Sequence, residues 1–139
     1  MITTALRPTL QRFSDNELLD ELKRLAARER EATVHVIAAL MEVEARRLYL
    51  AEGCPSLFVY CTQVLRFSEH AAYLRIEAAR AARRFPVILE LLTDGSLTLT
   101  TIGLLRAHLT EENHRQLLDA ARHKGKRDVE KMIAALRPL

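Results

Sequence analysis

Hydrophobic residues recur along this chain at intervals of three and four positions and nowhere alternate regularly with polar ones, which predicts an all-α protein. About seven helices account for residues 15–136, and no segment predicts a strand. Residues 14–139 are expected to form a single helical domain. Residues 1–13 contain Pro8 and show no periodicity, so we expect them to form a flexible N-terminal arm.

The longest periodic segment predicts one continuous helix over residues 15–51. Either Ser14 or Asp15 is expected to cap its start, and Gly53 is expected to end it. At 1.5 Å per residue, residues 15–50 would span roughly 54 Å, more than a small core requires. The excess length favours a partner, with a dimer seam at heptad-like spacing as one interpretation. The alternative is a solvated helix with ion pairs between its own side chains. The candidate dimerisation residues are Leu18, Leu22 and Leu25.

Two short helical patterns meet at residues 65–68 and predict a helix-turn-helix over residues 56–84. The first helix is strongly apolar and is expected to be largely buried. Ser68 caps the second helix. Projected at 100° per residue, the second helix is expected to bury one face and expose the other. The inner face contains Ala71, Leu74, Ala78, Ala81, Ala82 and Phe85, and the outer face contains Tyr73, Ile76, Arg80, Arg83 and Arg84.

The C-terminal part, residues 86–136, predicts several short helices. Pro86 ends the preceding helix, and Thr98 and Thr110 are the expected caps of two that follow. A basic link at residues 123–127 precedes the last helix.

The charge of the chain changes this picture only locally. With 21 Lys and Arg against 18 Asp and Glu, the net charge is +3, so any binding to a polyanion depends on clusters of cations. Guanidinium groups beside an aromatic ring suit phosphate contact. The candidate DNA-binding residues are Tyr73, Arg75, Arg80, Arg83, Arg84, Lys124, Lys126 and Arg127.

The N-terminus, the apolar segments and the two cysteines bear on where in the cell the protein is located. The N-terminus does not match a signal peptide, and no apolar run is long enough to span a bilayer, so we expect a cytoplasmic protein without a membrane partner. Cys54 and Cys61 are expected to be reduced packing residues.

Five segments carry a resemblance to the helical N-terminal region of bacterial HNH endonuclease family proteins. They are residues 48–58 (LYLAEGCPSLF), 84–86 (RFP), 94–99 (DGSLTL), 109–114 (LTEENH) and 126–130 (KRDVE). In that family the region precedes a separate ββα-metal nuclease module. A weaker resemblance, over residues 68–84, 86–92 and 95–98, is to the helix-turn-helix core of ParB-type partition proteins, which implies DNA binding.

The nuclease chemistry itself is not expected in this chain. An HNH nuclease needs a His that activates water and further ligands that hold a divalent ion. Here His108, Asn113 and His114 are close in sequence but have no carboxylate at ligand spacing, so we expect them to cap and to lie at the surface. We therefore expect no catalytic residue, cofactor, metal or small-molecule substrate.

Together these patterns predict a non-catalytic domain that binds double-stranded DNA, the N-terminal targeting part of an HNH endonuclease-like protein. The alternative is a protein-interaction or homodimerisation module without nucleic-acid affinity, which the long helix and its leucines favour.

Overall fold

The computed structural model describes residues 3–136, and all regular elements in this part are helices, as the sequence predicts. Nine α-helices, rather than about seven, are present among these residues. They are α1 (Thr3–Gln11), α2 (Asp15–Arg46), α3 (Leu48–Ala51), α4 (Leu57–Val59), α5 (Glu69–Arg84), α6 (Val87–Thr93), α7 (Leu99–Leu105), α8 (His114–Ala121) and α9 (Lys126–Ala135). A π-helical turn, η1 (Tyr60–Val64), continues α4, and a 3-10 turn, η2 (Arg106–His108), continues α7.

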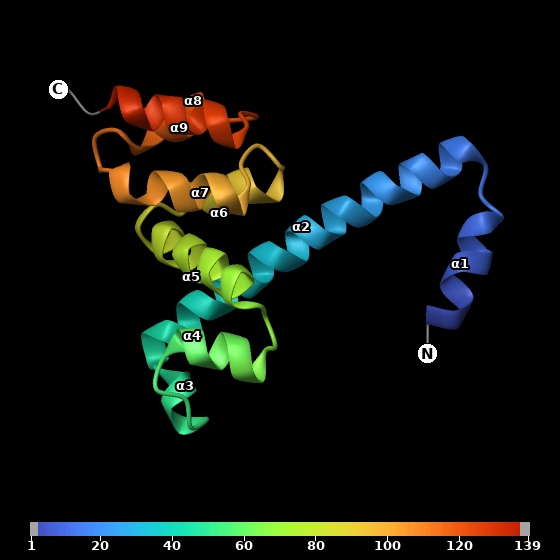
Figure 1. The fold of residues 1–139 in the computed structure, drawn as a ribbon, viewed down its shortest axis with the longest axis horizontal. Coiled ribbons are helices and arrows are strands. Elements are labelled where there is room, and N and C mark those ends of the chain that lie inside the picture. The colour runs from blue at the N-terminus through green and yellow to red at the C-terminus, as the bar shows by residue number, and fades with distance from the viewer. Residues whose placement is uncertain (1–2, 137–139) are drawn as a thin grey trace.

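The helices form a body from which half of α2 projects (Figure 1). The C-terminal half of α2 crosses α5, with α6 to α9 on one side of α5 and α3 and α4 on the other. The N-terminal half of α2 extends away from the body and carries α1 at its tip. We name the projecting residues 15–28 the stalk.

The start of α2 lies where the sequence predicts it, whereas the N-terminal segment contains a helix that was not predicted. Residues 3–11 are helical as α1, where we expected no regular element; the flexibility of residues 1–13 stays a prediction. α2 begins at a capping box, since Ser14 Oγ accepts from the Glu17 amide at 3.2 Å and the Ser14 amide donates to Glu17 Oε1 at 2.9 Å. Of the two predicted caps, Ser14 and Asp15, Ser14 is confirmed.

The continuous helix expected over residues 15–51 is wrong at its C-terminal end. Arg47 lies in the left-handed region, with φ 53° and ψ 39°, and its amide donates to the carbonyl oxygens of Val43 and Glu44. This geometry ends α2 and starts the short α3 in a new direction. Arginine gives no sequence signal for a left-handed residue, whereas Gly53, with φ 79°, does.

The first half of the expected helix-turn-helix is less buried than predicted. Leu57 and Cys61 point into the core, but Phe58, Val64 and Leu65 are exposed. Only two helical turns are present, so only one face can contact α5. Ser56 caps this element, accepting from the Val59 amide at 3.1 Å. Burial also raises the pKa of the Cys61 thiol, consistent with its role as a packing residue.

The core is built around α5, which is packed on more than one side. It contacts α2, α4, α6 and α7, and its alanines allow these helices to approach closely. Ile76 is only 5% exposed, so its predicted place on the outer face is wrong: that flank of α5 is covered as well. Fully buried side chains of this core include Ile37, Ala72, Ala78, Ala79, Ala82, Ile88, Ile102 and Leu105.

Candidate nucleic-acid interface

A solvent-facing stripe of α5 borders an open polar groove of about 470 Å³ between α5 and the end of α7. Tyr73, Arg80 and Arg84 line it from α5, at intervals of seven and four residues, and Arg106 lines it from η2. We name these four residues, together with Glu77 between them, the arginine groove. The ring of Tyr73 is 53% exposed at one end of the groove.

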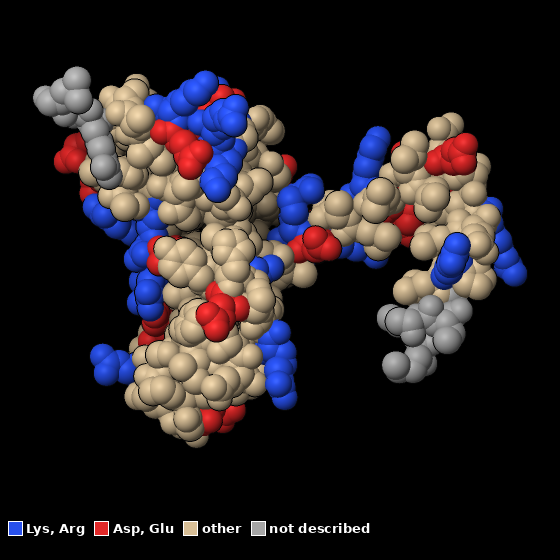
Figure 2. Space-filling view, viewed as in Figure 1, with Lys and Arg blue, Asp and Glu red and all other residues tan. Residues whose placement is uncertain are grey.

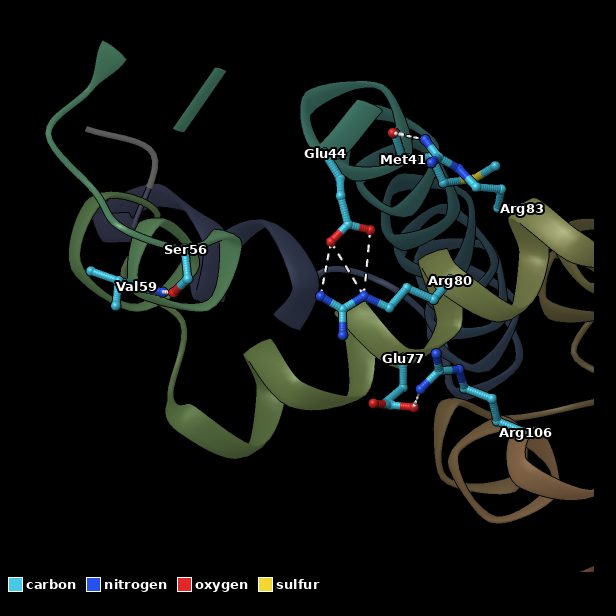
Figure 3. Close-up of polar contacts among 8 residues, drawn as sticks. All are labelled: Met41, Glu44, Ser56, Val59, Glu77, Arg80, Arg83 and Arg106. Carbon is cyan, nitrogen blue, oxygen red and sulfur yellow. Dashed lines mark hydrogen bonds and ion pairs between the residues drawn. The ribbon is translucent and has the colours of Figure 1, made fainter. Parts of the chain in front are cut away.

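Arg80 is held in the groove by a carboxylate of α2 (Figure 3). Its Nη2 lies 2.8 Å and its Nε 3.2 Å from Glu44 Oε2. Both side chains keep contact with solvent, at 44% exposure for Arg80 and 23% for Glu44. The hydrogen bond from Glu44 raises the pKa of Arg80 further above its usual range, so the guanidinium is charged at any physiological pH.

The other two groove arginines also have carboxylate partners. Arg106 forms an ion pair with Glu77, whose side chain is only 13% exposed (Figure 3). Arg84 Nε lies 3.8 Å from Glu111 Oε1, and its guanidinium carbon lies 4.8 Å from the centre of the Phe85 ring. The three arginines therefore line one groove, each beside a carboxylate.

Arg83 and Arg75 point away from the groove. Arg83 Nη2 donates to the Met41 carbonyl oxygen of α2 at 2.7 Å (Figure 3). Arg75 Nη1 donates to the Ala71 carbonyl oxygen at 3.1 Å and lies 5.1 Å from the Phe67 ring centre. Within residues 3–136 neither arginine forms an ion pair. The predicted DNA-binding residues of α5 are thus divided among three directions.

Lys124, Lys126 and Arg127 are exposed around the start of α9 and, in the described chain, form no ion pair. The link that carries them is fixed at its start, because the His123 amide donates to the Ser96 carbonyl oxygen at 2.8 Å. His123 itself is left-handed, with φ 61°.

A second cleft, of about 660 Å³, extends from Arg84 to Arg115 and Arg122 of the α8 region. Because Arg84 lines both clefts, cationic side chains continue from the arginine groove toward α8. Figure 2 shows Lys and Arg side chains along one edge of the body and over its α8 end, with Asp and Glu among them.

Sequence reasoning missed Arg106, Arg115 and Arg122. Arg106 and Arg115 lie in or beside short helices with no basic cluster around them, so no local pattern indicates that they line a cleft. Arg122 directly precedes the basic link at residues 123–127, and that position was the signal that could have found it. Glu77 and Arg106 are 29 residues apart in sequence, and only the packing of α7 against α5 brings them together.

His108, Asn113 and His114 are half-buried at the turn before α8, and none of their side chains caps that helix, so the capping and surface roles that we expected are wrong in these respects. Asn113 Oδ1 accepts from the Thr110 amide at 2.8 Å, and Asn113 Nδ2 donates to the His108 carbonyl oxygen at 2.9 Å. The His114 ring stacks on Phe85 with centres 4.4 Å apart. Among residues 3–136, no group of three or more His, Cys, Asp or Glu side chains could hold a metal ion.

The candidate dimerisation residues lie on the stalk. Leu18, Leu22 and Leu25 are 41%, 60% and 44% exposed, and Leu19 beside them is 55% exposed. They continue the face of α2 that is buried in the body at Ile37 and Leu40. Nothing in the described part of the chain covers this apolar stripe where it leaves the body.

Comparisons with known proteins give no relative for this chain: no family model, no curated protein and no solved structure matches it. No helix in the part of the chain that the structure describes has the length and apolar character needed to cross a membrane. Fold and site together define an all-helical protein with a basic groove on its body and an exposed leucine stripe on its stalk.

Proposed function

We propose that this chain is a non-catalytic helical domain that binds double-stranded DNA, with the arginine groove contacting backbone phosphates. The observation that supports it is the alignment of Arg80, Arg84 and Arg106 beside the exposed Tyr73 along one open groove. Phosphate contacts of this kind position a protein on a duplex and carry no base specificity.

The ion pairs of the groove do not preclude this role. An ion pair between solvent-exposed side chains contributes only about 0–1 kcal/mol, so Arg80 and Arg84 can exchange a carboxylate for a phosphate at little cost. Arg106 stays paired with Glu77, whose side chain is only 13% exposed, and adds its charge to the groove. Arginine offers a phosphate two parallel N–H donors, a geometry that lysine lacks.

The resemblance to the N-terminal region of HNH endonuclease family proteins suggests what DNA binding by this domain is for. A domain with phosphate contacts and no nuclease chemistry of its own would hold a linked nuclease module on its DNA substrate. The proposal is therefore a targeting role within an endonuclease-like protein.

The test is fluorescence anisotropy of a labelled duplex of random sequence, titrated with the protein from low to physiological salt. Two groove contacts are removed by Arg80→Gln with Arg84→Gln. A matched control, Arg7→Gln with Arg12→Gln, lowers the net charge equally at the far end of the molecule (Figure 1). If two phosphate contacts are lost, the slope of log affinity against log salt falls in magnitude by about 1.8.

The result that supports the groove is a lower slope for the groove variant and an unchanged slope for the control. No binding by the wild type at low salt would reject DNA binding. Equal losses in both variants would show that net charge, and not the groove, governs the interaction.

The second candidate function is a protein-interaction or homodimerisation module without nucleic-acid affinity. It is favoured by the exposed leucines of the stalk, because a contiguous apolar surface outside the core marks an interaction site. The anisotropy experiment separates the two functions, since this module would not bind the duplex at any salt concentration.

A further inference from the structure

We infer that the stalk pairs with the stalk of a second copy of this chain in antiparallel orientation. This inference rests on the second candidate function, the stalk as an interaction surface, and does not depend on DNA binding. Leu22, the most exposed large hydrophobic residue of the described chain at 60%, lies between Leu18 and Leu25 on the stripe.

The spacing of the stripe is suited to a helical partner. Leu18, Leu22 and Leu25 are separated by four and then three residues, the alternation by which two helices interlock side chains along a seam. The stalk is about 21 Å long at 1.5 Å per residue, so the seam is short. An antiparallel pair can place Leu22 of each copy beside Leu25 of the other, with Leu19 beside Ala26 at the edge.

Charge complementarity selects the second copy as the occupant and fixes the direction. Glu21 and Arg28 are seven residues apart and lie on the same flank of the leucine stripe. In an antiparallel pair this flank faces the same flank of the second copy. Glu21 of each copy then lies beside Arg28 of the other, and the two-fold symmetry makes this contact twice.

A parallel pair offers no such contact. In that arrangement the flank with Glu21 and Arg28 faces the opposite flank, which carries Leu19 and Ala26. Arg28 forms no ion pair within residues 3–136, so its charge is available to a second copy. Among the described residues Glu21 pairs with Arg24 of its own helix, and its side chain is 17% exposed, so the contact with Arg28 of a second copy requires Arg24 to turn away.

The body leaves room for the end of the second stalk. A cleft of about 400 Å³ lies where α2 enters the body, lined by Arg30, Val34 and Leu99 among other residues. In the antiparallel register, the start of the second copy's α2, which carries Asp15 and Glu17, reaches the level of Arg30. Arg30 and Arg75 outnumber Glu29 in this cleft, so the acidic start of one α2 meets a cleft of net positive charge at the root of the other.

The test is sedimentation equilibrium of the full chain without DNA, with three charge variants. The wild type is expected at twice its 15.8 kDa mass. Glu21→Arg places like charges together at both symmetric contacts and is expected to raise the dimer dissociation constant roughly tenfold. Adding Arg28→Glu to that variant is expected to restore the wild-type dissociation constant, because the exchanged charges attract each other again between the two copies. Residues two turns apart do not pair within one helix, so a rescue reports a contact between copies.

Asp20→Arg, on the side of α2 opposite the leucines, makes the same change of charge and is expected to leave the dimer intact. Leu22→Glu with Leu25→Glu is expected to give a monomer with unchanged helix content by circular dichroism. A monomeric wild type overturns the inference, and so does a dimer that Glu21→Arg leaves unaffected or that Arg28→Glu fails to rescue. None of these outcomes bears on the arginine groove, which the anisotropy experiment tests by itself.

Discussion

Arg80 of α5 and Glu44 of α2 are 36 residues apart in sequence, and Arg80 Nη2 lies 2.8 Å from Glu44 Oε2. The pair joins the central helix to the long helix at the mouth of the arginine groove. This contact between two helices therefore also sets the direction of a guanidinium group that we assign to phosphate binding.

Removing the carboxylate of this pair is expected to strengthen DNA binding. Glu44→Gln frees Arg80 and removes one negative charge near the groove, so affinity for a duplex at low salt should rise by about threefold to tenfold. The cost in unfolding free energy should be at most about 1 kcal/mol, because both side chains are partly exposed. Anisotropy and urea unfolding measure the two effects.

Glu42→Gln is the matched control for that change. Glu42 pairs only with Arg46 of its own helix, so its loss removes the same charge away from Arg80. Equal gains in affinity for both variants would count against a specific role of the groove.

Enlarging a buried alanine of α5 is expected to destabilise the body. Ala82 has no exposed surface, so Ala82→Leu forces neighbouring helices apart and should lower the unfolding free energy by about 1–3 kcal/mol. Ala38→Leu, on an exposed position of α2, should change it by less than about 0.5 kcal/mol. Urea unfolding of both variants checks this; similar losses would contradict the packing of α5 at the centre.

The left-handed residue between α2 and α3 predicts opposite effects of glycine at adjacent positions. Arg47, with φ 53°, adopts a conformation that glycine tolerates better, so Arg47→Gly should be neutral or slightly stabilising. Arg46→Gly, at the last residue of α2, also removes the ion pair with Glu42 and should destabilise by about 0.5–1 kcal/mol. Thermal unfolding that ranks the two variants the other way would place the break of the helix elsewhere.

The turn after α6 predicts a dependence of stability on pH. Hydrogen bonds from the Ser96 hydroxyl and amide hold the pKa of Asp94 below its ordinary value. A carboxyl whose pKa is lower in the folded state stabilises the fold above its unfolded pKa and loses that contribution as pH falls through the folded pKa. The wild type should therefore lose stability from about pH 5 downward, near and below the usual Asp range.

Two variants isolate this carboxyl. Asp94→Asn removes the titrating group, and Ser96→Ala removes the hydroxyl that lowers its pKa, so both should show a smaller loss of unfolding free energy on acidification. Urea unfolding at neutral pH and at about pH 3 gives the comparison. A loss in Asp94→Asn as large as in the wild type would assign the acid sensitivity to other carboxylates.

The sequence by itself determined the helical class and the start of several helices. Ser14, Ser68 and Thr98 cap as expected, because a cap depends on a side chain and an amide three residues away. The expected cap Thr110 accepts from the Asn113 amide at 3.0 Å but begins no helix, since α8 starts only at His114. The exposed outer positions Tyr73 and Arg80 were also predicted, since helical periodicity places residues on faces.

The tertiary structure alone decided which faces are covered. Ile76 is buried because a further helix packs on its flank. The leucines of the stalk are exposed because α2 extends beyond the body that covers Ile37 and Leu40. Arg106 reaches the groove, and Arg83 turns to α2, through contacts with residues far away in sequence. Helical periodicity determines which residues share a face of a helix. Which other helix packs against that face depends on the path of the whole chain.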